Sequence, residues 1–202
     1  MPIAVITGAS SGLGRAYALA ATEVFPEIDE YWLIARRLDR LEALKAEWVG
    51  KTVYCLPLDL SSPADLDEYQ RRLGERQPQV ALLVNSAGIG WMGDFADGSW
   101  RSQAALCDLN VRALTAVANI SLQRMAPGSV MVNVSSIAAF APTPRMSVYC
   151  STKAYVSSFS KALRFELRGR DIRVLAACPC PMDTEFLEVA GIRSKTFDRL
   201  PR

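Results

Sequence analysis

The sequence predicts an α/β fold in which a parallel β-sheet lies between two layers of helices. Short apolar runs alternate along the chain with longer segments that have the periodicity of a helix. The short runs are continuously apolar rather than alternating, which is typical of strands buried on both faces. These two observations together favour a doubly wound arrangement.

The alternation can be followed from the N-terminus to residue 177. Strands are expected at residues 3–6, 31–35, 53–58, 80–84, 130–134 and 172–177. Helices are expected at residues 13–24, 38–49, 64–73, 100–125 and 147–168. The third helix has the clearest start, because Ser61 and Ser62 can cap it and Pro63 suits its first turn. After Cys178 we expect a proline-rich loop and a polar tail, with no seventh strand evident.

The composition fits one domain spanning residues 1–202. Hydrophobic residues make up 50% of the chain, and the net charge is only +2. This balance gives no indication of a nucleic-acid or anionic-membrane partner, and no run of eighteen apolar residues suggests a membrane span. The N-terminal residues lead directly into a strand, so we expect no secretory signal and a cytoplasmic location.

Cysteine and histidine usage narrows the chemistry. The five cysteines are an odd number, which favours buried free thiols in a reducing compartment. Histidine is absent, so Ser135 and Ser136 cannot belong to a Ser-His-Asp triad, and a zinc dehydrogenase site of the Cys/His type would lack its nitrogen ligand. We therefore expect no metal site and acid–base chemistry from Tyr, Lys or a carboxylate.

A glycine-rich turn follows the first predicted strand and opens the first predicted helix, with the sequence Thr7-Gly8-Ala9-Ser10-Ser11-Gly12-Leu13-Gly14. Gly8 permits a tight turn, Gly12 lets the backbone approach a pyrophosphate, and Gly14 allows the helix to pack closely on the sheet. The helix N-terminus then offers N–H groups to phosphate. The alternative is a strand-to-helix turn that binds nothing.

Arg36 and Arg37 follow the second predicted strand, where a site that prefers NAD usually carries an acidic residue. Guanidinium groups favour the extra 2′-phosphate of NADP(H). We therefore expect NADP(H), with NAD(H) as the alternative cofactor and a solvated surface pair as the alternative interpretation.

Two further strand ends carry small or polar residues. Asp59 ends the third strand and could accept from the adenine amino group or cap the next helix. Asn85-Ser86-Ala87-Gly88 ends the fourth strand and suits close approach to a ribose, or it is an ordinary loop.

The candidate reacting centre combines Ser136, Tyr149 and Lys153. Tyr149 and Lys153 are four residues apart on a predicted helix and therefore share a face. A neighbouring cation is expected to lower the tyrosine pKa from about 10 by about 1–3 units, which suits proton transfer to an alkoxide. Ser136 follows a buried strand, where its hydroxyl can hold a carbonyl oxygen. Asn110 is a polar residue in an otherwise apolar helix, or a satisfied core or surface Asn.

With the glycine turn, this order and spacing closely resembles the short-chain dehydrogenase/reductase family, from Ile3 to about Phe186. The resemblance implies a Rossmann-like sheet in the order 3-2-1-4-5-6 and a tetrad of Asn110, Ser136, Tyr149 and Lys153. Tyr would be the acid/base, Ser would orient the substrate oxygen, Lys would bind the nicotinamide ribose and lower the Tyr pKa, and Asn would position a water. The expected cofactor-contacting residues are Gly8, Ser10, Ser11, Gly12, Leu13, Gly14, Arg36, Arg37, Asp59, Leu60, Asn85, Ala87, Gly88, Tyr149, Lys153, Pro179 and Thr184.

The chain departs from the family pattern at three places. Cys180 stands where Gly is usual after the sixth strand, and Ser86 stands in place of a second Asn. Residues 178–202 are expected to form an incomplete substrate-loop region without the usual seventh strand. On that expectation the sixth strand is an exposed edge or covered by the tail, with lowered stability and an open substrate site.

The function predicted is hydride transfer between NADP(H) and a small carbonyl or secondary-alcohol substrate. The alternative is a catalytically impaired scaffold or regulator that binds the cofactor. An epimerase-type relative would need a larger sugar-nucleotide domain, for which 202 residues leave no room. The substrate itself is not indicated: the candidate apolar side chains are equally compatible with ordinary packing, and they are Trp91, Met92, Phe95, Phe140 and Met146.

A homo-oligomer is also expected, a dimer or a tetramer. On the last predicted helix one large apolar stripe is assigned to the sheet: Val156, Phe159, Leu163 and Leu167. A second stripe of mainly small residues lies on a different face: Ala154, Ser158, Ala162 and Phe165. A second apolar face needs a partner, and the resemblance implies a dimer built from this helix and the helix that carries Asn110.

Overall fold

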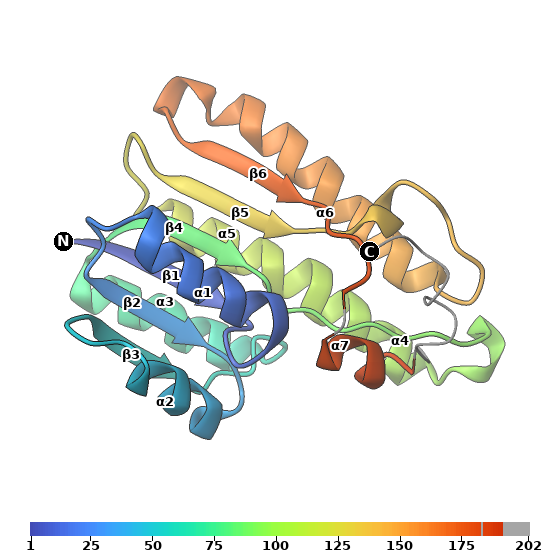
Figure 1. The fold of residues 1–202 in the computed structure, drawn as a ribbon. Coiled ribbons are helices and arrows are strands. Elements are labelled where there is room, and N and C mark those ends of the chain that lie inside the picture. The colour runs from blue at the N-terminus through green and yellow to red at the C-terminus, as the bar shows by residue number, and fades with distance from the viewer. Residues whose placement is uncertain (183, 192–202) are drawn as a thin grey trace.

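A six-stranded parallel sheet organises the computed structural model, which describes residues 1–182 and 184–191. The strand order is β3-β2-β1-β4-β5-β6, which confirms the predicted order. The strands are β1 (Pro2–Thr7), β2 (Glu30–Ile34), β3 (Thr52–Leu56), β4 (Gln79–Asn85), β5 (Val130–Val134) and β6 (Arg173–Ala177). All six point toward the same edge of the sheet, where the short helix α7 (Glu185–Val189) also lies (Figure 1).

Helices cover both faces of the sheet. Successive residues of a strand point to opposite faces, so each strand contributes side chains to two separate cores. Ala4 and Ile6 of β1 pack in one core with α1 (Gly12–Val24) and α2 (Leu38–Ala46). Ile3 and Val5 pack in the other core with α3 (Pro63–Arg76), α5 (Leu114–Leu122) and α6 (Ser147–Glu166). This burial on both faces explains the continuously apolar strand sequences.

The long helix expected at residues 100–125 runs without a break from Trp100 to Leu122 and contains a π-helical segment. The structure has α4 (Trp100–Cys107), then a π-helical segment η2 (Asp108–Ala113), then α5. Asn110 lies in the π segment and is almost completely buried. π segments inside α-helices often occur at functional sites because the extra residue redirects side chains. The predicted helix is therefore present, but helical periodicity alone could not reveal the π segment within it.

The segment after β6 contains an element that the sequence pattern did not indicate. Residues 178–182 form a loop, and α7 follows Thr184. With only five residues, α7 is too short to show helical periodicity. Within the described residues β6 pairs only with β5 and no seventh strand is present. Residues 192–202, which belong to the expected polar tail, lie outside the described residues.

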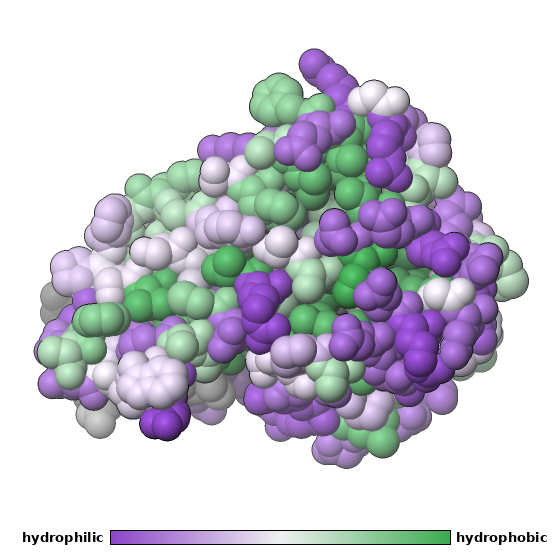
Figure 2. Space-filling view, turned by 180° about the vertical axis from the view of Figure 1, so that it is seen from behind, coloured by the Kyte–Doolittle hydropathy of each residue, from purple (hydrophilic) through white to green (hydrophobic). Residues whose placement is uncertain are grey.

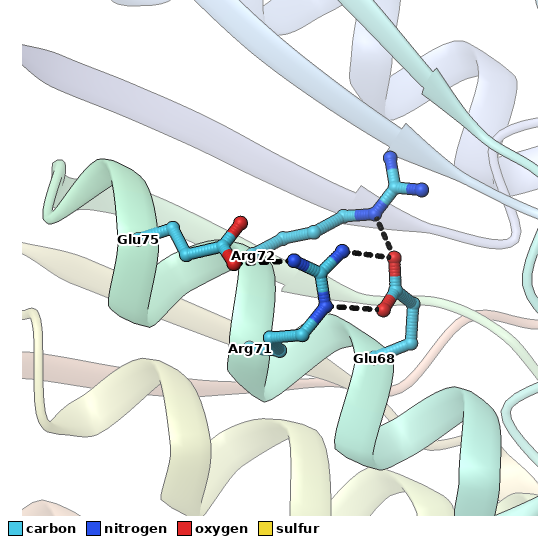
Figure 3. Close-up of polar contacts among 4 residues, drawn as sticks. All are labelled: Glu68, Arg71, Arg72 and Glu75. Carbon is cyan, nitrogen blue, oxygen red and sulfur yellow. Dashed lines mark hydrogen bonds and ion pairs between the residues drawn. The ribbon is translucent and has the colours of Figure 1, made fainter.

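The outer face of α3 carries a network of ion pairs (Figure 3). The Arg71 guanidinium binds Glu68 through Nε at 2.7 Å and through a second nitrogen at 2.8 Å, and it also contacts Glu75. Arg72 donates to Glu68 at 2.6 Å. Together these arginines lower the pKa of Glu68 to about 2. The side chains of Arg71 and Glu75 are 53% and 61% exposed, so the network belongs to the surface of α3.

The face opposite to that of Figure 1 has hydrophobic residues over its centre and top, whereas hydrophilic residues gather toward its right side (Figure 2). On α6, Ala154, Tyr155, Ser158, Ala162 and Phe165 are exposed, and Phe165 is 73% exposed. In the stripe assigned to the sheet, Val156, Leu163 and Leu167 are buried, and Phe159 is partly buried against the core that contains Leu163 and Leu167. The two stripes therefore separate as the sequence predicted.

None of the helices in the described part of the chain has the length and apolar character needed to cross a membrane. All five cysteines are free thiols.

Candidate active site

The glycine-rich turn between β1 and α1 depends on the absence of side chains at three positions. Gly8 and Gly12 have φ values of 69° and 51°, a region that favours glycine. A Cβ added to Gly14 would lie 2.2 Å from the Gly8 carbonyl oxygen, so only glycine lets α1 begin this close to the turn. The N-cap residue Ser11 makes no side-chain capping bond to α1. The first N–H groups of α1 are thus available to an anion.

Thr7 joins this turn to the loop after β4. Its hydroxyl oxygen accepts from the backbone N–H groups of Ser86 and Ala87, both at 3.0 Å. A Cβ on Gly8 would lie 2.9 Å from the Ala87 nitrogen, so the two loops are in contact. The loops that follow β1 and β4 are thereby held together at the carboxyl ends of the strands.

A cleft of about 490 Å³ runs along the strand ends, and it passes from the loops after β3 and β2 to those after β5 and β6. This volume is typical of a small-molecule or cofactor site. All predicted cofactor-contacting residues except Asn85 line it, and Ser136 lines it as well. Asn110 does not. Asn85 is buried and donates its side-chain amide to Asn133 at 3.0 Å, so its side chain stabilises neighbouring strands.

One end of the cleft carries charged side chains of both signs. Arg37 donates to the hydroxyls of Ser10 at 3.1 Å and Ser11 at 2.9 Å. It also pairs with Glu185 at 3.1 Å, and Arg40 contacts the other oxygen of that carboxylate. Arg36 lines the cleft. The hydrogen bond from the Ser61 hydroxyl lowers the pKa of Asp59, and the charge of Arg36 lowers it further.

Asp59 has a structural partner beside the cleft. Its Oδ1 accepts from the Ser61 hydroxyl at 2.6 Å and from the Ser61 backbone N–H at 3.0 Å. The N-cap of α3 is Ser62, whose hydroxyl oxygen accepts a hydrogen bond from the backbone N–H of Asp65. Asp59 is therefore not the helix cap, and its carboxylate stands at the cleft wall with Leu60.

Tyr149 and Lys153 reach the other end of the cleft from α6, as their spacing predicted. Tyr149 is 7% exposed. Burial raises the pKa of its hydroxyl, and the neighbouring Ser136 hydroxyl opposes that rise in part. The expected lowering of this pKa by Lys153 is not seen.

The position and pKa of Lys153 explain this difference. Its Nζ donates to the Val134 carbonyl at 2.9 Å and lies 5.8 Å from the centroid of the Tyr149 ring. Burial lowers the Lys153 pKa to about 8, so the cation is itself disfavoured. Desolvation therefore dominates both groups in this structure.

Two adjacent serines at the end of β5 have different surroundings. The Ser135 hydroxyl is buried, donates to the Lys153 carbonyl at 2.7 Å and lies 2.8 Å from the Ser157 hydroxyl. Ser136 faces the cleft and accepts from the Ala138 N–H at 3.2 Å. Ser135 therefore fixes the strand end to α6, and Ser136 is the hydroxyl that a substrate can reach.

Asn110 is fully engaged behind the cleft wall. Its amide group donates to the Ile89 carbonyl at 2.9 Å and to the Thr152 hydroxyl at 3.1 Å. Its Oδ1 accepts from the Ile89 N–H at 2.9 Å. A Cβ on Gly88 would lie 3.1 Å from this oxygen. The π segment thus holds the Gly88–Ile89 loop against α6.

Helix α7 covers the end of the cleft that contains Tyr149. The Phe186 ring lies 5.6 Å from the Tyr149 ring, and a Cβ on Gly90 would lie 2.5 Å from the Phe186 ring. The Met92 N–H donates to the Ala190 carbonyl at 3.0 Å, which fastens α7 to the loop after β4. Sequence reasoning assigned no role to Phe186 or Glu185, because a five-residue helix gives no periodic signal.

The remaining predicted residues also lie at this wall. The Pro179 carbonyl accepts from the Ile137 N–H at 3.2 Å. A Cβ on Gly12 would lie 3.6 Å from the Thr184 Cβ, so Thr184 stands over the glycine turn. Cys180 lines the cleft and is exposed, so its side chain does not fill the interior.

The residues present fit a nicotinamide dinucleotide. Gly8, Gly12 and Gly14 form a cradle that added Cβ atoms would fill or strain. An uncapped helix begins at that cradle, and arginines stand at the next strand end. One cleft connects these features to Ser136 and Tyr149. This arrangement can hold a diphosphate and place a ring beside a proton donor.

Comparisons with known proteins agree with this geometry. A family model described as short chain dehydrogenase matches residues 2–193. Sulfoacetaldehyde reductase of Chromohalobacter salexigens is 36% identical over 190 residues, which cover 90% of this chain and 72% of the relative. A Mycobacterium bovis protein named "Probable oxidoreductase EphD" is 31% identical over 201 residues, which cover 96% of this chain but only 33% of the relative. A short-chain dehydrogenase from Sphingobium yanoikuyae, solved in complex with NADPH, superposes with a TM-score of 0.88 at 35% identity, covering 100% of this chain and 78% of that one.

Proposed function

The chain belongs to the short-chain dehydrogenase/reductase family of NAD(P)-dependent oxidoreductases acting on CH–OH groups, and we propose that it reduces a carbonyl compound with NADPH, or performs the reverse oxidation. The observation that carries this proposal is the single cleft in which the glycine turn, Ser136, Tyr149 and Lys153 meet.

A bound nicotinamide would supply or accept the hydride. Ser136 would hold the substrate oxygen through its cleft-facing hydroxyl, and Tyr149 would donate a proton to that oxygen as negative charge develops. The raised pKa keeps Tyr149 protonated near neutral pH, which is the form needed for reduction.

Lys153 and Asn110 act by positioning in this proposal. Lys153 lies under the Tyr149 ring and is tied to β5 through the Val134 carbonyl. Its remaining N–H groups are suited to a ribose hydroxyl. Asn110 holds Gly88 and Ile89 at the cleft wall through both sides of its amide. A water-positioning role for Asn110 would come in addition to this one.

NADP(H) is the proposed cofactor because Arg36 and Arg37 stand at the cleft beyond β2 and no described acidic residue follows that strand directly. The Sphingobium relative, which was solved with NADPH, is consistent with this choice. A charge-assisted hydrogen bond contributes roughly 1.5–3 kcal/mol, which corresponds to a preference of about ten- to hundredfold over NADH. Replacing Arg36 by Asp should erase or reverse that preference.

The substrate end of the cleft is apolar in the described residues. Ala138, Met146 and Leu187 line it around Tyr149, and Phe186 packs against the same ring. The charged groups of the cleft other than Lys153 lie at the opposite end, near Arg37. We therefore propose a neutral apolar ketone or aldehyde rather than an anionic one such as sulfoacetaldehyde.

A cofactor-binding scaffold with impaired catalysis remains the second candidate. It is favoured by the packing of the Phe186 ring on the Tyr149 ring and by the low exposure of Tyr149, which is 7%.

NADPH oxidation measured with a panel of neutral ketones, aldehydes and sulfoacetaldehyde tests the proposal, with NADPH binding measured separately by fluorescence. Turnover of neutral carbonyls supports the enzyme. Tight NADPH binding without turnover of any compound would favour the scaffold, and preferred turnover of sulfoacetaldehyde would contradict the neutral substrate class.

A further inference from the structure

Glu185 makes an ionic clasp between α7 and the segment that follows β2. One carboxylate oxygen of Glu185 pairs with Arg37 at 3.1 Å, and the other contacts Arg40. Glu185 is 148 residues from Arg37 and 145 residues from Arg40 in the sequence. The clasp therefore joins the cover of the substrate end to the charged end of the cleft.

The position on Arg37 that Glu185 occupies is an anion position. The Arg37 guanidinium is held by the hydroxyls of Ser10 and Ser11, which belong to the glycine turn. Both Arg37 and Glu185 line the cleft, and their side chains are 42% and 41% exposed. A carboxylate and a phosphate use the same donors of a guanidinium. A ligand phosphate that enters beside the turn would therefore meet an arginine already paired with a carboxylate.

We propose that Glu185 competes with the 2′-phosphate of NADP(H) for Arg37 and is thereby a determinant of cofactor preference. This inference rests on the proposed function, namely that the cleft binds a nicotinamide dinucleotide with Arg37 at the 2′ position. In the absence of that phosphate Glu185 holds Arg37. When the phosphate is present, Arg37 exchanges one anion for the other.

The clasp is weak enough to be displaced. Its residues are solvent-exposed, and exposed ion pairs contribute little individually. A phosphate monoester carries more charge than a carboxylate, so it is the stronger partner for a guanidinium. NADH has no such phosphate and leaves the clasp in place. Glu185 should thus weaken NADPH binding and have little effect on NADH binding.

The same exchange links the cofactor to the substrate end. Glu185 is the first residue of α7, and the next residue, Phe186, packs against Tyr149. Release of Glu185 from the arginines removes the ion pairs that hold the start of α7, whereas the hydrogen bond from the Met92 N–H to the Ala190 carbonyl remains.

Glu185→Gln tests the inference, and Glu188→Gln is the matched control, since Glu188 is exposed on the same helix but does not share the contacts to Arg37 and Arg40. Dissociation constants for NADPH and NADH would be measured by fluorescence, and those for 2′,5′-ADP and 5′-ADP by calorimetry. With Glu185→Gln, NADPH and 2′,5′-ADP should bind about three- to tenfold more tightly, as expected for the loss of weak exposed ion pairs. NADH, 5′-ADP and the control variant should change by less than about twofold.

An unchanged or reduced NADPH-to-NADH affinity ratio in Glu185→Gln would overturn the inference while leaving the proposed function intact. Equal weakening of all four ligands would also overturn it, because Glu185 would then hold the site together. If the unmodified protein binds neither dinucleotide, the proposed function itself fails and the inference fails with it. Glu185→Ala carries the same expectations should the glutamine variant not fold.

Discussion

Burial favours the uncharged forms of both Tyr149 and Lys153. It raises the pKa of the tyrosine hydroxyl and lowers that of the lysine ammonium to about 8. A protonated tyrosine is ready to donate in the reductive direction, whereas oxidation of an alcohol needs the phenolate. The positive charge of an oxidised nicotinamide would help to form that phenolate. If Tyr149 is the acid/base, as proposed, its raised pKa favours the reductive direction.

Tyr149→Phe should remove the proposed proton donor and leave the ring that packs against Phe186. General acid catalysis contributes a factor of about 10² to 10⁴ to the rate. Loss of the hydroxyl should therefore lower kcat by at least about 10²-fold. The Kd for NADPH should change by less than about twofold, because the hydroxyl is the only group removed. Stopped-flow turnover and fluorescence titration measure the two quantities. A variant that keeps near-normal kcat would show that another group donates the proton.

Lys153 should make the stability of the protein depend on pH in a defined window. Its folded-state pKa of about 8 lies below the usual value of 10.5, so between these values the unfolded chain binds more protons. The free energy of unfolding should therefore rise with pH, by roughly 1 kcal/mol from pH 8 to 9.

Lys153→Met keeps most of the side-chain volume and removes the titration. The free energy of unfolding would be measured by denaturant at pH 8 and pH 9 for wild type and variant. The difference between the two proteins separates Lys153 from other titrating groups, such as Cys55, whose pKa is raised by burial to about 11. An equal pH dependence in both proteins would mean that Lys153 is not perturbed.

At the scale of elements, the glycine turn was predictable because each glycine has a local reason that the sequence shows. Gly8 and Gly12 require positive φ, and Gly14 lies within the first turn of the helix that follows. The π segment was not predictable. It depends on where the amide of Asn110 meets the backbone of Ile89, a contact between segments that are 21 residues apart. Periodicity within one helix carries no information on such a partner.

Gly14→Ala should disrupt the junction of β1 and α1. The added Cβ would lie 2.2 Å from the Gly8 carbonyl oxygen, which is backbone and cannot rotate away. Overpacking of this kind typically costs about 1–3 kcal/mol, and NADPH affinity should fall because the cradle must open.

Gly74→Ala is the matched control for this substitution. Gly74 lies in α3, and a Cβ there meets nothing within 4 Å. Alanine is the better helix former, so this variant should gain roughly 0.5–1 kcal/mol. Thermal unfolding of both variants checks the pair. Equal effects would mean that glycine acts at Gly14 through helix propensity alone.

At the scale of the whole molecule, the alternation of strands and helices predicted a parallel sheet, and the resemblance to a known family supplied the strand order. The cleft then follows, because the carboxyl ends of parallel strands meet at one edge. Ser136, Tyr149 and Lys153 were found from spacing because each follows or lies in a strongly patterned element. The cover formed by α7 was missed, because its place is set by Phe186 packing on Gly90 and Tyr149 rather than by its own sequence.

The exposed outer stripe of α6 predicts a homodimer. Ala162 and Phe165 are exposed on this helix, and Phe165 is among the most exposed large hydrophobic side chains at 73%. Small residues let a second helix approach closely, and burial of a phenylalanine contributes about 1.5–3 kcal/mol per chain. Light scattering at micromolar concentration should therefore give the mass of two 22.1 kDa chains.

Phe165→Glu should convert this dimer to a monomer, because it places like charges on each other across a symmetric interface. Val24→Glu introduces the same charge at a position on α1 that is 67% exposed and lies on the opposite face of the sheet, so it should leave the dimer unchanged. A monomeric wild-type protein would refute the prediction. A dimer that survives Phe165→Glu but dissociates with Val24→Glu would move the interface to the α1 and α2 face.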